Sequence, residues 1–301
     1  MFNIVHNKKI FFTIPIIIIV IGIVSMFIQG FNLDIDFRGG TTINAALGKD
    51  FDNQEVSDAI KDVLGYAPSS VQKSGDDGTD VVIKVMHKSG QQELDTTQRG
   101  ELTQALIDKC GIEEAAISIS NVSATIGKEL TSQSLLLCII TIALMLIYIT
   151  IRFEVRSGLA AVLALTHDVL IMLTCYSLFR IPVNTSFIAA ILTILGYSIN
   201  ATIIVFDRIR EGMRGATKKT VISDVVEKSI WSTIGRSINT SVTTLLTIVL
   251  LFFIGVPSLK EFTLPLIIGI ICGTYSSIFI AGPFWSMWKE NSAKARKVAT
   301  K

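Results

Sequence analysis

Six long apolar runs constrain the fold of this chain more than any other feature of its sequence. A helix needs about 20 predominantly apolar residues to cross the hydrocarbon core of a bilayer. Half of the 301 residues are hydrophobic and only 17% are charged, which a single soluble core does not explain. The sequence therefore predicts a polytopic α-helical membrane protein with six transmembrane helices. These spans are expected at about residues 10–28, 135–151, 159–179, 187–206, 238–254 and 264–288.

The positions of the apolar runs divide the chain into four parts. The first apolar run is expected to stay as an uncleaved anchor, because residues 27–31 offer no small-x-small cleavage site. Apolar and charged residues alternate at helical spacing over about residues 215–232, which predicts a cytoplasmic interfacial helix against membrane lipid. The expected parts are an N-terminus with transmembrane helix 1 (1–30), a separate domain (31–133), transmembrane helices 2–6 (134–288) and a basic tail (289–301).

The distribution of charge predicts the orientation of the chain. If the six spans alternate, nearly all Lys and Arg residues of the short loops fall on one side of the membrane, and only Arg180 and Lys260 fall on the other. By the positive-inside rule, both termini are cytoplasmic and the domain after the first span is extracytoplasmic. That domain carries 17 acidic and 9 basic side chains, a balance of −8, whereas the remainder carries 18 basic and 8 acidic ones.

Residues 31–133 show the pattern of a small α+β domain. Strands are expected at 33–47, interrupted by two glycines, at 71–73 and 81–87, joined by a turn over 75–78, and at 115–122. Helices are expected at 52–64, with Asp52 as N-cap, and at 95–109, ended by Gly111. The order strand, helix, two strands, helix, strand is that of a ferredoxin-like unit. The sequence thus predicts one ferredoxin-like α+β extracytoplasmic domain between helices 1 and 2.

No residue pattern indicates an enzyme, a metal site or a cofactor. We refer to the predicted domain at residues 31–133 as the outer domain. His87 is its single histidine, and one titratable group without a partner makes no acid and base pair. The four cysteines lack the spacing of metal ligands and are interpreted as packing residues. We expect no catalytic residue, no metal, no cofactor and no nucleic-acid partner.

The fourth span departs most from an ordinary membrane helix. Gly196, Asn200 and Asp207 fall on one helix face, and the charged end continues with Arg208. A stripe of small and polar groups on a membrane helix requires protein or water beside it. This face is therefore expected to contact another protein segment or a hydrated path, with Thr202 as a further polar group nearby.

Asp168 lies about halfway along the third span. A central Asp costs about 2.5 to 3.5 kcal/mol even on the lower scales, so its carboxyl group must face a polar interior, stay protonated, or both. Two interpretations remain open: a neutral, hydrogen-bonded structural group and a proton-handling group. His167 is one position away on the helix and is expected to point elsewhere.

The fifth span carries a basic group with hydroxyls below it. Arg236 and Thr240 share one face with Thr243, Thr244 and Thr247, which suggests a hydrated path or a hydrogen-bonded seam. The alternative is that Arg236, close to the membrane edge, extends its side chain to the interface.

Two adjacent glycines follow the first span in the segment Asp36, Phe37, Arg38, Gly39, Gly40 and Thr41. Phosphate binding fails on context, because neither a complete Gly-rich loop nor a P-loop Lys follows. A bend at which two backbones approach closely is the preferred interpretation.

Three of these segments together resemble the SecF members of the SecD/SecF family, which belongs to the resistance-nodulation-division superfamily. They are residues 36–41, 163–171 and 196–211, and the six spans with one outer insert occur in the same order. The resemblance implies a subunit that pairs with SecD in the bacterial cytoplasmic membrane and uses the ion-motive force to promote late steps of preprotein export. It further implies the SecYEG translocon with SecA, YajC and YidC, membrane lipid and unfolded preproteins as partners.

Two other function classes compete with this interpretation. A small-molecule or lipid exporter subunit of the same superfamily would usually carry two large outer domains and twelve spans in one chain, whereas this chain shows one insert. An intramembrane enzyme would need paired carboxylates, a nucleophile with its base, or metal ligands at membrane depth. Copurification with a SecD-like subunit would separate these classes from the export subunit.

The chain departs from the family pattern at Ala201, where the fourth helix commonly carries Asp between Asn and Thr. The resemblance implies that this Asp and an Arg matching Arg236 form the proton-responsive pair, so the usual relay is incomplete here. Three explanations stay open. Asp168 is the titrating acid of this chain, the SecD-like partner supplies the acid, or the chain is uncoupled from the ion gradient.

Overall fold

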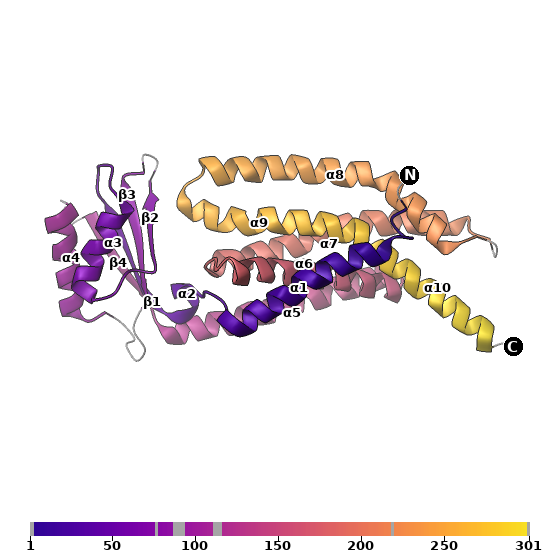
Figure 1. The fold of residues 1–301 in the computed structure, drawn as a ribbon, viewed down its shortest axis with the longest axis horizontal. Coiled ribbons are helices and arrows are strands. Elements are labelled where there is room, and N and C mark those ends of the chain that lie inside the picture. The colour runs from indigo at the N-terminus through magenta and orange to yellow at the C-terminus, as the bar shows by residue number, and fades with distance from the viewer. Residues whose placement is uncertain (1–2, 76–77, 87–93, 111–115, 218–219, 300–301) are drawn as a thin grey trace.

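The computed structural model describes residues 3–75, 78–86, 94–110, 116–217 and 220–299. It shows a bundle of long helices with a small α/β domain at one end (Figure 1). Helix α1 begins and α10 ends at the opposite end of the bundle. Within the described residues, six helical segments are long and apolar enough to cross a membrane, which confirms the predicted number. The long helices are α1 (Lys8–Gln29), α5 (Ala124–Arg152), α6 (Val155–Leu178), α7 (Thr185–Arg214), α8 (Ile222–Ile254), α9 (Pro257–Ser276), the π-helical turn η2 (Ser277–Ala281) and α10 (Gly282–Ala299).

Two of the long helices differ from the sequence-based expectation. Helix α5 begins at Ala124 rather than near residue 135, because Ser123 caps it by accepting a hydrogen bond from the Ile126 amide at 3.3 Å. Helix α8 runs without a break from Ile222, so the separate surface helix expected at about 215–232 is instead the first part of α8. No proline interrupts this helix, and its backbone hydrogen bonds continue into the apolar stretch.

Helices α6, α7 and α9 form the centre of the bundle. Glycines bring α9 close to α7: a Cβ atom at Gly269 would lie 2.5 Å from Ile194 Cγ1, and one at Gly273 would lie 2.9 Å from Ser198 Cβ. These small residues of the sixth span therefore allow α9 to pack closely against α7. The outer helices α1, α5 and α8 instead expose many large apolar side chains, as a lipid-facing surface requires.

The domain between α1 and α5 has a four-stranded antiparallel sheet with strand order β2-β3-β1-β4. Helices α3 and α4 cover the sheet face that points away from the bundle (Figure 1). Asp52 caps α3, as predicted, by accepting a hydrogen bond from the Gln54 amide at 2.9 Å. The predicted ferredoxin-like order is confirmed. Its elements are β1 (Gly40–Ala46), α3 (Asn53–Leu64), β2 (Ser70–Ser74), β3 (Asp80–Met86), α4 (Thr96–Cys110) and β4 (Ile117–Val122).

The first predicted strand was too long. The expected strand at 33–47 is divided into a single helical turn, α2 (Ile35–Arg38), and strand β1. Asp34 caps this turn by accepting a hydrogen bond from the Ile35 amide at 2.8 Å, which favours helical over extended backbone here. Residues 76 and 77 of the predicted turn, His87, Gly111, residue 115, Lys218 and Lys219 lie outside the described residues.

The N-terminal segment is held against α8 by one carboxylate. The Ile4 and Val5 amides donate to the two oxygens of Glu227 at 2.9 and 2.7 Å, and Trp231 Nε1 donates to the same side chain at 2.7 Å. Hydrogen bonds to a charged group contribute about 1.5–3 kcal/mol each.

We expect Glu227→Gln to lower hydrogen-exchange protection of the Ile4 and Val5 amides by about tenfold or more. Glu290→Gln is the matched control, and equal loss of protection in both variants would contradict this account.

Candidate functional site

Asp168 forms the centre of a buried hydrogen-bonded cluster in the middle of the bundle. Its side chain is fully buried. Its Oδ2 atom accepts hydrogen bonds from Ser198 Oγ of α7 at 2.5 Å and from Ser276 Oγ of α9 at 3.0 Å, and its Oδ1 atom lies 2.9 Å from His167 Nδ1. We name these four residues the Asp168 centre. Because the carboxyl group of α6 is held by α7 and α9, any change in its charge acts on the contacts among three helices.

The expectation that His167 points away from Asp168 was wrong. Consecutive helical residues leave the axis about 100° apart, but the imidazole reaches back to the neighbouring carboxyl group. The Tyr275 ring supports it, with ring centroids 5.9 Å apart and planes 25° from parallel. His167 also lines an apolar cavity of about 290 Å³ with Phe12 of α1 and Leu170 of α6. The imidazole therefore lies between Asp168 and this cavity.

The backbone beside the Asp168 centre is irregular. Ser276 is the last residue of α9, and the π-helical turn η2 begins at Ser277. Such π-helical turns inside α-helices occur frequently at functional sites. The Ser276 hydroxyl also approaches the Gly273 carbonyl oxygen at 3.3 Å. Sequence reasoning missed Ser198 and Ser276. In the sequence, each of them is a hydroxyl group within an apolar run, but many other serines of the chain have the same setting. Residue spacing alone does not show which helix faces contact Asp168.

The other predicted polar residues of spans four and five lie mostly on exposed faces of α7 and α8. On α7, Gly196, Asn200 and Asp207 are exposed; on α8, Arg236 and Thr240 are exposed. We name these five residues the exposed polar stripe. The Thr240 hydroxyl donates to the Arg236 carbonyl oxygen at 2.9 Å, so it is satisfied within its own helix.

Thr202 does not join the exposed polar stripe. It is 1% exposed, and its hydroxyl has no hydrogen-bond partner in the described part of the chain. Arg236 and Asp168 are also separated: Asp168 is fully buried among α6, α7 and α9, whereas Arg236 lines a surface cavity with Asp207 and Arg208. Asp168 and Arg236 therefore belong to separate polar regions, the first inside the bundle and the second on its surface.

The double glycine turns the chain between α2 and β1. Gly39 has φ 83° and ψ 151°, a conformation that residues with a side chain rarely adopt. A Cβ atom at Gly40 would lie 2.4 Å from Ile35 Cγ2 and 2.6 Å from the Val85 carbonyl oxygen. In the same segment Phe37 is buried and Arg38 is exposed. These contacts support the bend that the sequence indicated.

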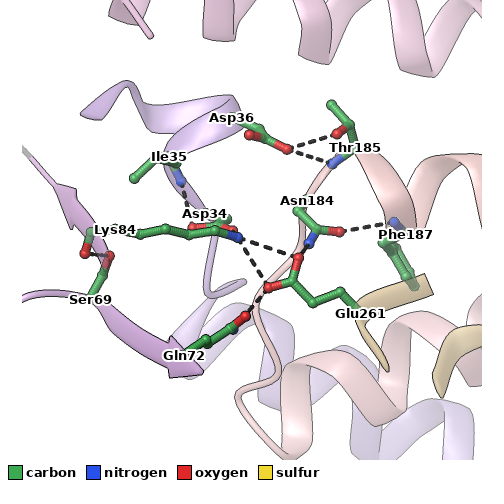
Figure 2. A network of polar contacts seen from close by, with 10 residues as sticks. All are labelled: Asp34, Ile35, Asp36, Ser69, Gln72, Lys84, Asn184, Thr185, Phe187 and Glu261. Carbon is green, nitrogen blue, oxygen red and sulfur yellow. Dashed lines mark hydrogen bonds and ion pairs between the residues drawn. The ribbon is translucent and has the colours of Figure 1, made fainter. Parts of the chain in front are cut away.

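A polar network joins the outer domain to the bundle (Figure 2). Lys84 of β3 pairs with Asp34 at 2.7 Å and with Glu261 of α9 at 3.1 Å. Glu261 also accepts hydrogen bonds from Asn184 at 2.5 Å and from Gln72 of β2 at 3.0 Å. We name these five residues the outer network. Glu261 stands in the second turn of the helix whose last residue is Ser276, so α9 connects the outer network to the Asp168 centre.

Two further contacts define the chemistry beside the outer network. Asp36 accepts hydrogen bonds from the Thr185 amide at 2.9 Å and from the Thr185 hydroxyl at 2.8 Å, which ties the glycine segment to the start of α7. The ion pairs of Lys84 change its titration. Burial alone would lower the pKa of Lys84, but the pairing with Asp34 and Glu261 outweighs burial and raises the pKa above its ordinary value. A raised pKa means that the pairing is fully present below the ordinary lysine pKa and is lost only as the pH rises through the raised one.

The fold and these sites define a class: an integral membrane subunit with a ferredoxin-like insert and a buried carboxyl group within its helices, six of which are long and apolar in the described part of the chain. The family model "Protein export membrane protein SecD/SecF, C-terminal" matches residues 103–291, and the "SecD/SecF GG Motif" matches residues 24–48. The chain therefore belongs to the SecD/SecF family of protein-export membrane proteins.

Relatives and solved structures agree with this assignment. A protein translocase subunit SecF of Acidaminococcus fermentans is 37% identical over 290 residues, covering 96% of this chain and 98% of the relative. Protein translocase subunit SecDF of Bacillus subtilis is 34% identical over 96% of this chain, which spans 38% of that relative. The crystal structure of SecDF from Thermus thermophilus, a translocon-associated membrane protein, aligns at 30% identity with a TM-score of 0.79 over 96% of this chain and 39% of that one. The chain is thus a translocase subunit of this family.

Proposed function

We propose that this subunit pairs with a SecD protein and uses the ion-motive force to promote late steps of preprotein export. The observation that carries the proposal is the Asp168 centre, a carboxyl group with no exposed surface held by hydroxyls of two other helices. A buried carboxyl group within membrane helices is costly to keep and is a mark of ion or proton pathways. The full-length match to SecF subunits supports the same conclusion.

Proton binding at Asp168 would change the packing of the bundle. Hydrogen bonds to an ionised acceptor are about twice as strong as neutral ones, so protonation weakens the bonds from Ser198 and Ser276 to the carboxyl group. Helix α9 carries Ser276 at one end and Glu261 of the outer network near the other. A shift of α9 would therefore reach the outer domain. Among the three explanations for Ala201, this arrangement favours Asp168 as the acid of this chain.

The proposal places the subunit in the cytoplasmic membrane of a bacterium, with both termini cytoplasmic and the ferredoxin-like domain outside. Outside residues 31–133, most basic residues lie at the start of α1, around the connection between α5 and α6, around the connection between α7 and α8, and in α10. Helix α1 begins and α10 ends at one end of the bundle, and the sheet domain lies at the other end (Figure 1). The proposed partners beyond SecD are the SecYEG translocon with SecA, YajC, YidC and unfolded preproteins. The proposed role is that of a transport subunit and not of an enzyme.

The exposed polar stripe is the proposed contact surface for SecD. Nothing lies within 4 Å of a Cβ atom at Gly196 in this chain, so Gly196→Leu should leave the isolated subunit folded. A larger side chain would hold a partner helix away, because close helix contacts in membranes depend on small residues. We expect this variant to retain about a tenth or less of wild-type SecD in copurification, which corresponds to a loss of about 1.4 kcal/mol or more in binding.

Gly235→Leu on α8 is the matched control for this experiment. A Cβ atom there also meets nothing within 4 Å, and Gly235 lies on the side of α8 that exposes Val242 and Leu246. It should copurify with SecD as the wild type does. Equal binding by both variants would show that SecD does not use the exposed polar stripe. Wild-type protein that fails to copurify with SecD and instead alters efflux of dyes or lipids would favour the exporter class.

A further inference from the structure

Five arginine side chains line a surface cavity at the end of the bundle where α10 ends. The cavity has a volume of about 430 Å³ and lies among α5, α7 and α8. Two acidic side chains, Asp207 and Glu211, also line it, so five positive and two negative charges leave a formal balance of +3 (5 − 2). The arginines are Arg152 of α5, Arg208, Arg210 and Arg214 of α7, and Arg236 of α8.

The arginines of this cavity, which we name the arginine cavity, are only partly neutralised within the chain. Arg208 pairs with Glu211 at 2.5 Å, and Arg210 donates to the Arg152 carbonyl oxygen at 3.2 Å. In the described part of the chain, the side chains of Arg214 and Arg236 form no hydrogen bond and no ion pair. The cavity therefore holds guanidinium groups that are available to an anion.

Two of these guanidinium groups are already positioned. Arg152 and Arg210 lie over the Phe153 ring, with Cζ 5.4 and 5.9 Å from the ring centroid. An aromatic face holds a guanidinium by cation–π attraction and leaves its N–H groups free at the edge. Guanidinium groups bind phosphate through paired hydrogen bonds, and prior positioning reduces the entropy lost on binding. The arrangement suits a phosphate group.

The location of the arginine cavity points to a lipid as the source of that phosphate. The cavity lies where α5 leaves the apolar region, and the last turn of α5 exposes Tyr148 (56%) and Ile151 (80%) beside Arg152. Basic pockets between transmembrane helices at the cytoplasmic face bind anionic lipid head groups. A phospholipid bound here would place its phosphate among the arginines and its acyl chains along the apolar side chains of α5.

We propose that the arginine cavity binds the phosphate of an anionic phospholipid. The bound lipid neutralises part of the excess charge and links the ends of α5 and α7 to the middle of α8. The cavity shares Asp207 and Arg236 with the exposed polar stripe, whereas Arg152 and Arg214 lie outside that stripe. The proposed site depends on the chain being a membrane protein and does not depend on ion coupling.

The test uses the purified full chain in detergent with phosphatidylglycerol or phosphatidylcholine, and native mass spectrometry counts the retained lipids. We expect wild-type protein to retain phosphatidylglycerol preferentially. The variant Arg152→Gln with Arg214→Gln should lose about tenfold in phosphatidylglycerol affinity. The control Lys8→Gln with Lys9→Gln removes the same charge at the same end of the bundle, outside the cavity, and should bind as the wild type does.

Four outcomes would overturn the proposal. Equal retention of both lipids by wild-type protein would show no anion preference. Equal losses in the arginine and lysine variants would show a general charge effect. Displacement of phosphatidylglycerol by inorganic phosphate in large excess would mark a free-anion site. If the arginine variant keeps the lipid but loses SecD, the cavity is a protein contact and the proposal is also wrong.

Discussion

Asp168→Asn is expected to remove most of the stimulation of preprotein export by the proton gradient. Asn has nearly the same shape and still accepts hydrogen bonds from Ser198 and Ser276, so the bundle should fold, but it does not titrate. We expect the gradient-stimulated rate of export to fall about tenfold or more, and each tenfold step corresponds to about 1.4 kcal/mol of additional activation free energy. The measurement is export of a preprotein into inverted membrane vesicles, with and without an imposed gradient, at matched amounts of the subunit.

Asp224→Asn is the control for this experiment, because Asp224 is an exposed carboxylate at the start of α8. It should keep the full gradient response. The variant Ser198→Ala with Ser276→Ala should give an intermediate response, since the carboxyl group remains but loses two of its hydrogen bonds. An unchanged gradient response in Asp168→Asn would eliminate Asp168 as the titrating acid. The acid would then belong to the partner, or the chain would be uncoupled.

Lys84→Met is expected to separate the outer domain from the bundle. The side chain of Lys84 is 14% exposed and that of Asp34 only 5%, so the variant leaves buried negative charge without its counter-ion. Breaking a buried pair by removing one partner costs about 3–5 kcal/mol. Hydrogen exchange of the amides in β3 and in the first turns of α9 measures the loss of contact, and protection should fall in both segments together.

Lys73→Met on the same sheet is the matched control. Lys73 pairs with Asp50, and the two side chains are 38% and 90% exposed. An exposed pair contributes at most about 1 kcal/mol, so this variant should keep nearly all the protection in α9. Equal and small effects of the two substitutions would show that the outer network does not hold the domain. Because the pKa of Lys84 is raised, its side chain stays protonated from neutral pH up to the ordinary lysine pKa. In the wild type, the ion pairs of Lys84 should therefore persist over this pH range, and Lys84 should cause no loss of protection there.

The sequence predicted those parts of the fold that depend on local patterns. The number of spans followed from apolar run lengths, and the ferredoxin-like order followed from alternation, the Asp52 cap and turn residues. Local patterns gave the wrong outcome where two signals competed. The Asp34 cap overrode strand alternation at α2, and the continuous helical backbone of α8 overrode the amphipathic signal at 215–232.

The candidate sites were predicted less completely, because contacts between distant segments set them. Asp168 was identifiable from its cost in an apolar span, but its contacts with Ser198 and Ser276 depend on which faces of α7 and α9 meet it. The outer network was not predicted at all, since Lys84 and Glu261 are 177 positions apart in the chain. Thr202 was expected among the polar lining, yet the rotation of α7 places it in the core.

The most direct test of the whole account compares vesicles that contain SecD with this subunit and vesicles that contain SecD alone. Preprotein that has been driven partway across by SecA is held without further ATP, and its completion is followed after a proton gradient is imposed. The account predicts that the gradient accelerates completion only when this subunit is present and carries Asp168. Acceleration of the same size in its absence would contradict the account.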